Sequence, residues 1–206
     1  MVIVIMVITA LVSIWALQDR NQLDKLIFYP FHMDDSRQWY RFITHGFIHA
    51  DWIHLFFNMF VLFTFGSHAE ELFKVIKGNQ LGQLYFVTFY LAALVAASTP
   101  SYLRNRHNPN YRSLGASGAV ASVLFFFILF YPLEKLSLMF LPIPIPAFIF
   151  GALYLVYEYV MDKRQNTGVA HDAHFWGALF GILFAIVLYP GVIGLFIQQI
   201  RVFLHL

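Results

Sequence analysis

The sequence predicts an all-α membrane protein, a polytopic bundle of six transmembrane helices. Of the 206 residues, 60% are hydrophobic and only 12% are charged. A soluble domain has about 45–50% apolar and about 25% charged residues. Long apolar stretches also recur along the chain between polar connections, and one bilayer crossing needs about 20 such residues. Composition and segment length therefore predict the same architecture.

We expect one domain over residues 1–206 and assign its elements in chain order. The spans are expected at roughly 1–17, 51–72, 80–98, 114–131, 144–160 and 172–189. The first stretch lacks a basic n-region and a small-residue cleavage site, so it is interpreted as an uncleaved helix. Residues 18–50 form a long polar-aromatic connection, and a proline-rich turn precedes the fifth span.

The tail, residues 192–206, carries polar side chains at helical spacing among apolar ones. This pattern is typical of a helix that lies in the membrane interface. A frayed end of the last span is the alternative.

Charge and cysteine content exclude several classes of function. The formal net charge of +2 is too small to indicate a nucleic-acid partner. The chain has no cysteine, which excludes disulfides, thiol catalysis and thiolate metal sites. We expect no cofactor, and the partners expected are the lipid bilayer and membrane proteins.

The orientation in the membrane stays open. An even number of crossings places both termini on one side, where the connections and the tail hold 4 of the 13 basic residues and the opposite side holds 9. The positive-inside rule would then place the termini outside the cytoplasm. The long first connection is exempt from that rule if it folds into the interface.

Gly115-Ala116-Ser117-Gly118 stands at the head of an apolar run and supplies a candidate nucleophile. If a helix begins here, Ser117 lies in its first turn, close to unpaired backbone N–H groups. Those donors and the positive end of the helix dipole would stabilise an oxyanion. The alternative is ordinary packing of small residues between helices.

His174 supplies a candidate base for that serine. Gly177 and Gly181 follow it on nearly the same helix face, a pattern that lets two helices approach closely. A serine hydroxyl needs a base within hydrogen-bond reach to act as a nucleophile. Taken alone, His174 would more often be a packed or interfacial histidine.

His54 and Asn58 are spaced i, i+4 and share one helix face. Both side chains can donate hydrogen bonds to a developing negative charge, and one such donor is worth about 3–4 kcal/mol in a transition state. Hydrogen bonding between helices is the alternative.

Aromatic and basic residues at 39–42, followed by His45 and His49, suit a membrane interface. The histidine series also raises the possibility of a metal site. No carboxylate or cysteine accompanies it at ligand spacing, so we favour a structural role and expect no metal.

Together these stretches resemble one family, the rhomboid intramembrane serine proteases. The resemblance covers essentially the whole chain and keeps the order of the family's motifs. It rests on Trp39-Tyr-Arg-Phe-Ile-Thr-His-Gly-Phe-Ile-His49, His54-x-x-x-Asn58, Gly66-x-x-x-Glu70, Gly-Ala-Ser-Gly at 115–118, and Ala173-His174-x-x-Gly177-x-x-x-Gly181.

The resemblance implies a role for each candidate residue. Ser117 would be the nucleophile, and His174 the general base and then the general acid. His54, Asn58 and the Ser117 N–H would form the oxyanion hole, with Gly115 permitting the tight backbone there. The resemblance also implies a Ser–His dyad without a carboxylate.

Other polar residues near the motifs are then expected to stay outside the chemistry. Asp172 suits a helix N-cap, His171 would be peripheral, and Glu158 would lie at the interface. Many relatives place an aromatic residue against the catalytic histidine one turn after the serine, where this chain has Ala121. Candidate substitutes on the fifth span are Tyr154, Tyr157 and Tyr159.

The function expected from the resemblance is an intramembrane serine endopeptidase that cleaves transmembrane segments of other proteins. We expect a multi-pass protein of a plasma or inner membrane, with residues 161–170 as a movable cap and the fifth helix beside the route that the substrate takes. Two alternatives remain: an inactive relative that binds membrane segments, and a histidine-based metal or solute transporter. The transporter is disfavoured because no inverted repeat is visible.

Overall fold

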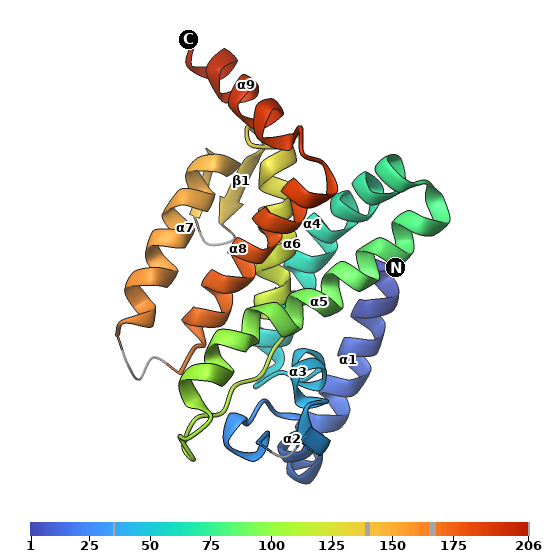
Figure 1. The fold of residues 1–206 in the computed structure, drawn as a ribbon, viewed down its shortest axis with the longest axis vertical. Coiled ribbons are helices and arrows are strands. Elements are labelled where there is room, and N and C mark those ends of the chain that lie inside the picture. The colour runs from blue at the N-terminus through green and yellow to red at the C-terminus, as the bar shows by residue number, and fades with distance from the viewer. Residues whose placement is uncertain (35, 139–140, 165–167, 206) are drawn as a thin grey trace.

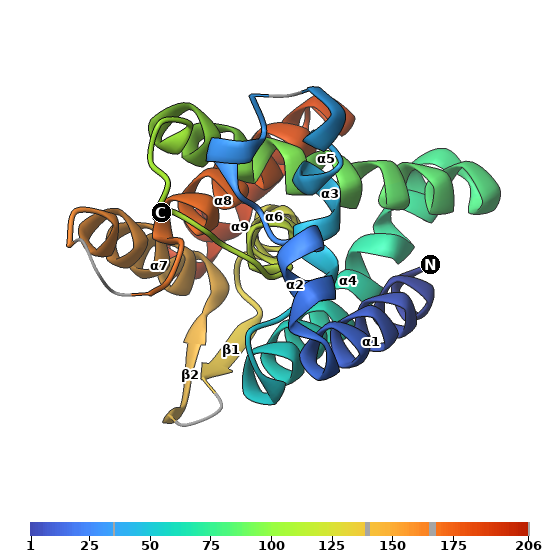
Figure 2. The same ribbon diagram turned by 90° about the horizontal axis from the view of Figure 1, so that it is seen from below.

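The computed structural model describes residues 1–34, 36–138, 141–164 and 168–205. It is a helical bundle in which α6 (Ser117–Phe130) lies at the centre (Figures 1 and 2). The helices around α6 are α4 (Trp52–Lys77), α5 (Asn79–Asn105), α7 (Ala147–Asp162) and α8 (His171–Leu188). Helix α1 (Val2–Gln18) packs against α4, and α9 (Val192–Leu204) follows α8. The predicted helical membrane bundle is confirmed.

Length and apolar character qualify α5 and α8 as membrane spans by themselves. A third candidate is α4 together with the short helices before it, which meet α4 at a bend of 97°. Helices α1, α6 and α9 are apolar but shorter. The assignment of each of the six expected spans stays a prediction, as does the interfacial position of α9.

The connection before α4 is folded into several short helices. It contains α2 (Arg20–Leu26), α3 (Arg41–Thr44) and three single turns, η1 (Pro30–His32), η2 (Ser36–Gln38) and η3 (His45–Phe47). Arg41 is buried here and donates to the backbone carbonyls of Asp24 (2.9 Å) and Ile27 (2.6 Å). This arginine therefore ties the loop to itself, while Trp39 and Tyr40 are exposed as an interfacial aromatic pair would be.

Aromatic side chains fill the core between α4, α5, α6 and α8. Phe73 stacks on Phe126 with ring centroids 4.8 Å apart, and Phe89 packs against Phe126 and Phe184. Offset and tilted ring pairs of this kind add to the stabilisation that their buried area supplies. This core fixes α6 and α8 relative to the rest of the bundle.

Helices α6 and α8 touch backbone to backbone. A Cβ atom at Gly177 would lie 2.1 Å from the carbonyl oxygen of Gly118, and one at Gly181 would lie 2.1 Å from that of Ser122. The Ser122 hydroxyl donates across the contact to the Gly177 carbonyl at 2.7 Å. We call these four residues the glycine crossing; they confirm the close helix contact predicted from Gly177 and Gly181.

The proline-rich segment before α7 is a β-hairpin, which the sequence reasoning missed. Strand β1 (Lys135–Leu138) pairs antiparallel with β2 (Leu141–Pro146), with Lys135 opposite Pro146. Prolines lack an N–H and are tolerated at the edge of a sheet. Both strands of a two-stranded sheet are edges, so alternate prolines in β2 are compatible with it. Helix α7 consequently begins at Ala147, later than the expected start at 144.

Candidate active site

Ser117 is the first residue of α6, as expected. The turn that leads into it is held by two backbone hydrogen bonds. The Gly115 N–H donates to the His45 carbonyl at 2.9 Å, and the Ala116 N–H donates to His49 Nε2 at 3.4 Å. The N–H of Ser117 belongs to the first turn of a helix, where no intrahelical carbonyl is available to it.

His174 lies in the first turn of α8, and the glycine crossing brings it to the serine. Its Nε2 is 2.6 Å from Ser117 Oγ. Both residues are half-buried. The predicted meeting of an alcohol on one helix with an imidazole on another is therefore present in the structure.

His54 lies beside the turn that precedes Ser117. Gly115 has φ +116°, and a Cβ atom there would lie 2.6 Å from His54 Cε1 and 2.8 Å from His54 Nε2. Only glycine both adopts this backbone conformation readily and leaves room for the ring. Asn58 is buried one helical turn further along α4, and its amide donates to the His54 carbonyl at 2.9 Å.

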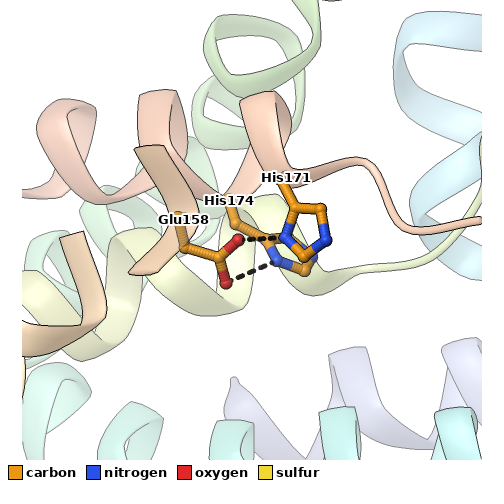
Figure 3. A group of neighbouring side chains, drawn as sticks. All are labelled: Glu158, His171 and His174. Carbon is orange, nitrogen blue, oxygen red and sulfur yellow. Dashed lines mark hydrogen bonds and ion pairs between the residues drawn. The ribbon is translucent and has the colours of Figure 1, made fainter. Parts of the chain in front are cut away.

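Glu158 and His171 are placed otherwise than expected. The sequence reasoning put Glu158 at the interface, yet this residue is 3% exposed. One carboxylate oxygen lies 3.0 Å from His174 Nδ1, and the other lies 2.5 Å from Nδ1 of the buried His171 (Figure 3). We call Glu158, His171 and His174 the acid–histidine cluster.

The group that contacts His174 at Nδ1 is thus a carboxylate. The tyrosines considered as substitutes for a stacking aromatic do not occupy that place: Tyr157 and Tyr159 are exposed, and Tyr154 packs against Phe125. One sequence signal could have located the cluster. A lone acidic residue in an apolar helix needs a partner, and His171 and His174 share one face of the neighbouring helix at i, i+3 spacing.

Asp172 is not a helix N-cap, because α8 begins at His171 with Ala170 as its N-cap. Asp172 accepts the Ala173 N–H at 2.9 Å and the Ser101 hydroxyl at 2.6 Å. It therefore ties the start of α8 to α5, and its exclusion from the chemistry stays a prediction.

The His49 ring supports the turn before Ser117, whereas His45 contributes its backbone carbonyl to that turn, and the structural role expected of the His45 ring stays a prediction. His49 Nδ1 lies 2.9 Å from the hydroxyl of Ser13, which itself donates to the Phe47 carbonyl. The ring therefore donates from Nδ1 and accepts from Ala116 at Nε2, which requires the neutral form. Burial, together with the nearby His54, lowers the pKa of His49 to about 3 and keeps it neutral.

A metal ion would find one suitable group of donors in the described part of the chain. The ligand atoms of Glu158, His171 and His174 lie within 4.8 Å of one another. The metal alternative considered from the sequence lacked a carboxylate, and this cluster supplies one. The expectation that the protein binds no metal stays a prediction.

The segment expected to act as a cap, residues 161–170, lies partly outside the described residues. Its described part includes Asp162, which forms an ion pair with Arg104 of α5 at 2.8 Å. A cap function stays a prediction.

Comparison with known proteins identifies the family to which the chain is similar. The model of the Rhomboid domain family matches residues 36–191. The mouse presenilin-associated rhomboid-like protein, mitochondrial, is 34% identical over 145 residues, which cover 66% of this chain and 34% of the mouse protein.

Two proteins of Arabidopsis thaliana are also similar. RHOMBOID-like protein 12, mitochondrial, is 29% identical over 143 residues, covering 66% of this chain and 42% of that protein. Rhomboid-like protein 11, chloroplastic, is 32% identical over 159 residues, covering 70% and 51%. The chain therefore matches about a third to a half of the length of these relatives. With the family model matching most of its length, the chain belongs to the rhomboid family.

Proposed function

We propose that this protein is an intramembrane serine endopeptidase that cleaves transmembrane segments of other membrane proteins. The observation that carries the proposal is the 2.6 Å contact between Ser117 Oγ and His174 Nε2. A hydroxyl and an imidazole in contact between apolar helices form the pair that nucleophilic hydrolysis needs.

The proposed reaction proceeds in two halves. Ser117 Oγ attacks the scissile carbonyl while its proton passes to His174 Nε2. The C–N bond then breaks, the proton goes to the leaving amine, and an acyl-serine remains. Water attacks that ester after losing a proton to His174, and the acid product leaves with Ser117 restored.

The negative charge on the former carbonyl oxygen needs donors. We assign this role to the Ser117 N–H and to the His54 and Asn58 side chains. His54 is already adjacent to Gly115, but the Asn58 amide donates to the His54 carbonyl. The Asn58 amide has a second N–H besides the one that donates to the His54 carbonyl, and we assign the oxyanion contact to that second N–H.

Replacement of the nucleophile tests the proposal. Ser117→Ala removes one hydroxyl, so cleavage of a transmembrane substrate in proteoliposomes should fall to background. Labelling of the purified protein by a fluorophosphonate probe should vanish with it. Ser122→Ala is the matched control, since it removes a hydroxyl from the same helix and should remain labelled. Persistent cleavage by the Ser117→Ala protein would overturn the nucleophile assignment.

The two competing functions make different predictions. An inactive binder of membrane segments would capture the substrate but give no labelling of Ser117. A metal or solute transporter would use His45, His49, His54, His171 and His174, and it would retain stoichiometric metal after purification. The geometry favours the protease over the transporter because His45 and His49 support the turn before Ser117, away from the acid–histidine cluster.

The protein is an integral membrane protein, and its membrane is part of the proposal. We expected a plasma or inner membrane, whereas the relatives compared above carry mitochondrial or chloroplastic names. Fractionation of source cells with a tagged chain distinguishes these membranes. A reporter that is active on one side only, fused to each terminus in turn, determines the orientation.

A further inference from the structure

Glu158 is buried although its helix neighbours are exposed. Glu158 is 3% exposed, whereas Tyr157 and Tyr159 are 55% and 51% exposed. Its side chain therefore leaves α7 toward the bundle interior. A carboxylate placed inside an apolar bundle is costly unless its oxygens are hydrogen-bonded, and such residues usually have a function.

Both oxygens of this carboxylate are occupied by imidazole rings (Figure 3). The distances are 3.0 Å to His174 Nδ1 and 2.5 Å to His171 Nδ1. An ionised carboxylate only accepts hydrogen bonds, so each Nδ1 must carry a proton. A neutral His174 then has its lone pair on Nε2, the nitrogen that faces the Ser117 hydroxyl.

We propose that Glu158 is the third member of a Ser117–His174–Glu158 triad, a positioning residue that holds His174 in its base-competent tautomer, and that His171 anchors its second oxygen. The inference rests on the proposed protease function. It replaces the expected dyad by a chain of three groups that come from α6, α8 and α7.

Charge strengthens the role once the reaction begins. When the Ser117 proton moves to Nε2, His174 becomes an imidazolium with the carboxylate 3.0 Å from its Nδ1. At the same distance, a carboxylate attracts an imidazolium more strongly inside the bundle than in water. The proton stays on Nδ1 throughout, and Glu158 is not itself protonated.

His171 explains how the carboxylate keeps its direction. His171 and His174 are three residues apart in the first turn of α8, so their rings hold the two oxygens from one rigid element. With both oxygens bound, rotation of the carboxylate about its last bond would break two hydrogen bonds.

Steady-state kinetics of the full chain in proteoliposomes test the inference. Glu158→Gln removes the charge and no longer requires a proton on His174 Nδ1. We expect kcat to fall about a hundredfold or more, with KM changed less than about threefold. Glu158→Asp keeps the charge at a greater distance and should recover part of that loss. His171→Leu should lower kcat less than Glu158→Gln.

Glu70→Gln is the matched control, because Glu70 is another buried carboxylate, on α4, and accepts the Val2 N–H at 2.8 Å. It should change thermal stability and leave kcat within about twofold. A Glu158→Gln protein that retains more than half of the wild-type kcat overturns the inference. If Glu158→Gln fails to fold, Glu158→Asp decides: a folded Asp variant with full kcat overturns the triad, and a loss of about tenfold supports it.

Failure of the inference differs from failure of the proposed function. If the wild-type protein is neither labelled by the fluorophosphonate probe nor able to cleave, the protease proposal itself is wrong. If the wild type is labelled and Glu158→Gln is labelled at the same rate, only the triad is wrong.

Discussion

The two sides of His174 are built differently. On the serine side, every residue of α6 from Gly118 to Ile128 is buried, and the glycine crossing brings α6 and α8 into backbone contact. On the carboxylate side, α7 buries only Ala147, Gly151 and Glu158 of its 16 residues, all of which are described. Ser117 and His174 are thus positioned by close packing, whereas the Glu158 carboxylate is held mainly by its own hydrogen bonds.

The two contacts of His174 therefore differ in how firmly the fold fixes them. Close-packed backbones allow few alternative arrangements, so the Ser117–His174 distance is fixed by the fold. A helix with few buried residues shifts at lower cost, so the Glu158 contact is the adjustable one. We therefore expect the position of Ser117 relative to His174 to vary little, and that of Glu158 to vary more.

The largest difference in stability is expected between two glycine-to-alanine variants, one in the contact between α6 and α8 and one on α7. Gly177→Ala puts a Cβ atom 2.1 Å from the Gly118 carbonyl oxygen, which is backbone and cannot move aside. We expect destabilisation of about 3 kcal/mol or more and loss of activity. Gly151→Ala on α7 meets the flexible end of Ile128 at 3.2 Å and should change stability by less than about 1 kcal/mol.

Thermal unfolding in detergent measures both variants. Gly194→Ala on α9 is the control for helix propensity, since a Cβ atom there has no neighbour within 4 Å. Equal losses at Gly177 and Gly151 would abolish the distinction between the two sides.

Acidification should lower the stability of the folded protein because His49, which supports the turn before Ser117, is buried in its neutral form. The folded pKa of about 3 lies below the ordinary value of 6.5 because the ring is buried, with His54 adding to the effect and Asp51 opposing it. Below about pH 6.5 the unfolded chain gains a proton that the folded protein does not, so stability falls by about 1.4 kcal/mol per pH unit down to about pH 3. Above pH 6.5 this contribution is constant.

His49→Gln removes the titrating group and should flatten this part of the dependence of Tm on pH between 7 and 5. The informative quantity is the difference in slope between the two proteins. Parallel slopes would show that His49 is already protonated in the folded protein or is not buried there.

Added zinc tests the acid–histidine cluster. A zinc ion bound by the acid–histidine cluster would take the Nδ1 position of His174, which forces the ring proton onto Nε2 and removes the base. If the cluster binds zinc, micromolar zinc should slow fluorophosphonate labelling about tenfold and EDTA should reverse the effect; unchanged labelling would support the expectation that the protein binds no metal. His171→Leu should weaken the inhibition. Zinc that accelerates the reaction would instead indicate a metal-dependent site.

The smallest effect is expected at the hydroxyl within the glycine crossing. Ser122→Ala removes the 2.7 Å hydrogen bond to the Gly177 carbonyl and should cost about 1 kcal/mol, as interhelical hydrogen bonds in membranes do. Thermal unfolding reports the cost. A much larger loss would mean that this bond, more than the packing of glycines, sets the helix contact.

Much of this architecture could be predicted from the sequence because local pattern carries it. Apolar length predicts the helices, and Gly177 and Gly181 at i, i+4 predict a close helix contact. Ser117 and His174 could be paired because each stands at a helix start beside small residues. These signals are short-range, or they rest on a family resemblance that spans the chain.

The carboxylate was missed because its position depends on how two helices are rotated against each other. The apolar residues around Glu158 indicate that this carboxylate needs a polar partner, but they do not tell how α7 is rotated relative to α8. The β-hairpin was missed for a related reason: Pro142, Pro144 and Pro146 disfavour a strand locally. Only pairing with residues 135–138 explains their conformation.

The contact between Ser13 and His49 links α1 to the turn before Ser117. Ser13 lies on α1, before the family match begins at residue 36, yet through His49 it supports the N–H of Ala116, next to the nucleophile. Trimming the chain to the matched region would remove the Ser13 hydroxyl that contacts His49 and would leave the turn before Ser117 without this support. The unit that supports the turn before Ser117 therefore extends beyond the region that the family model matches.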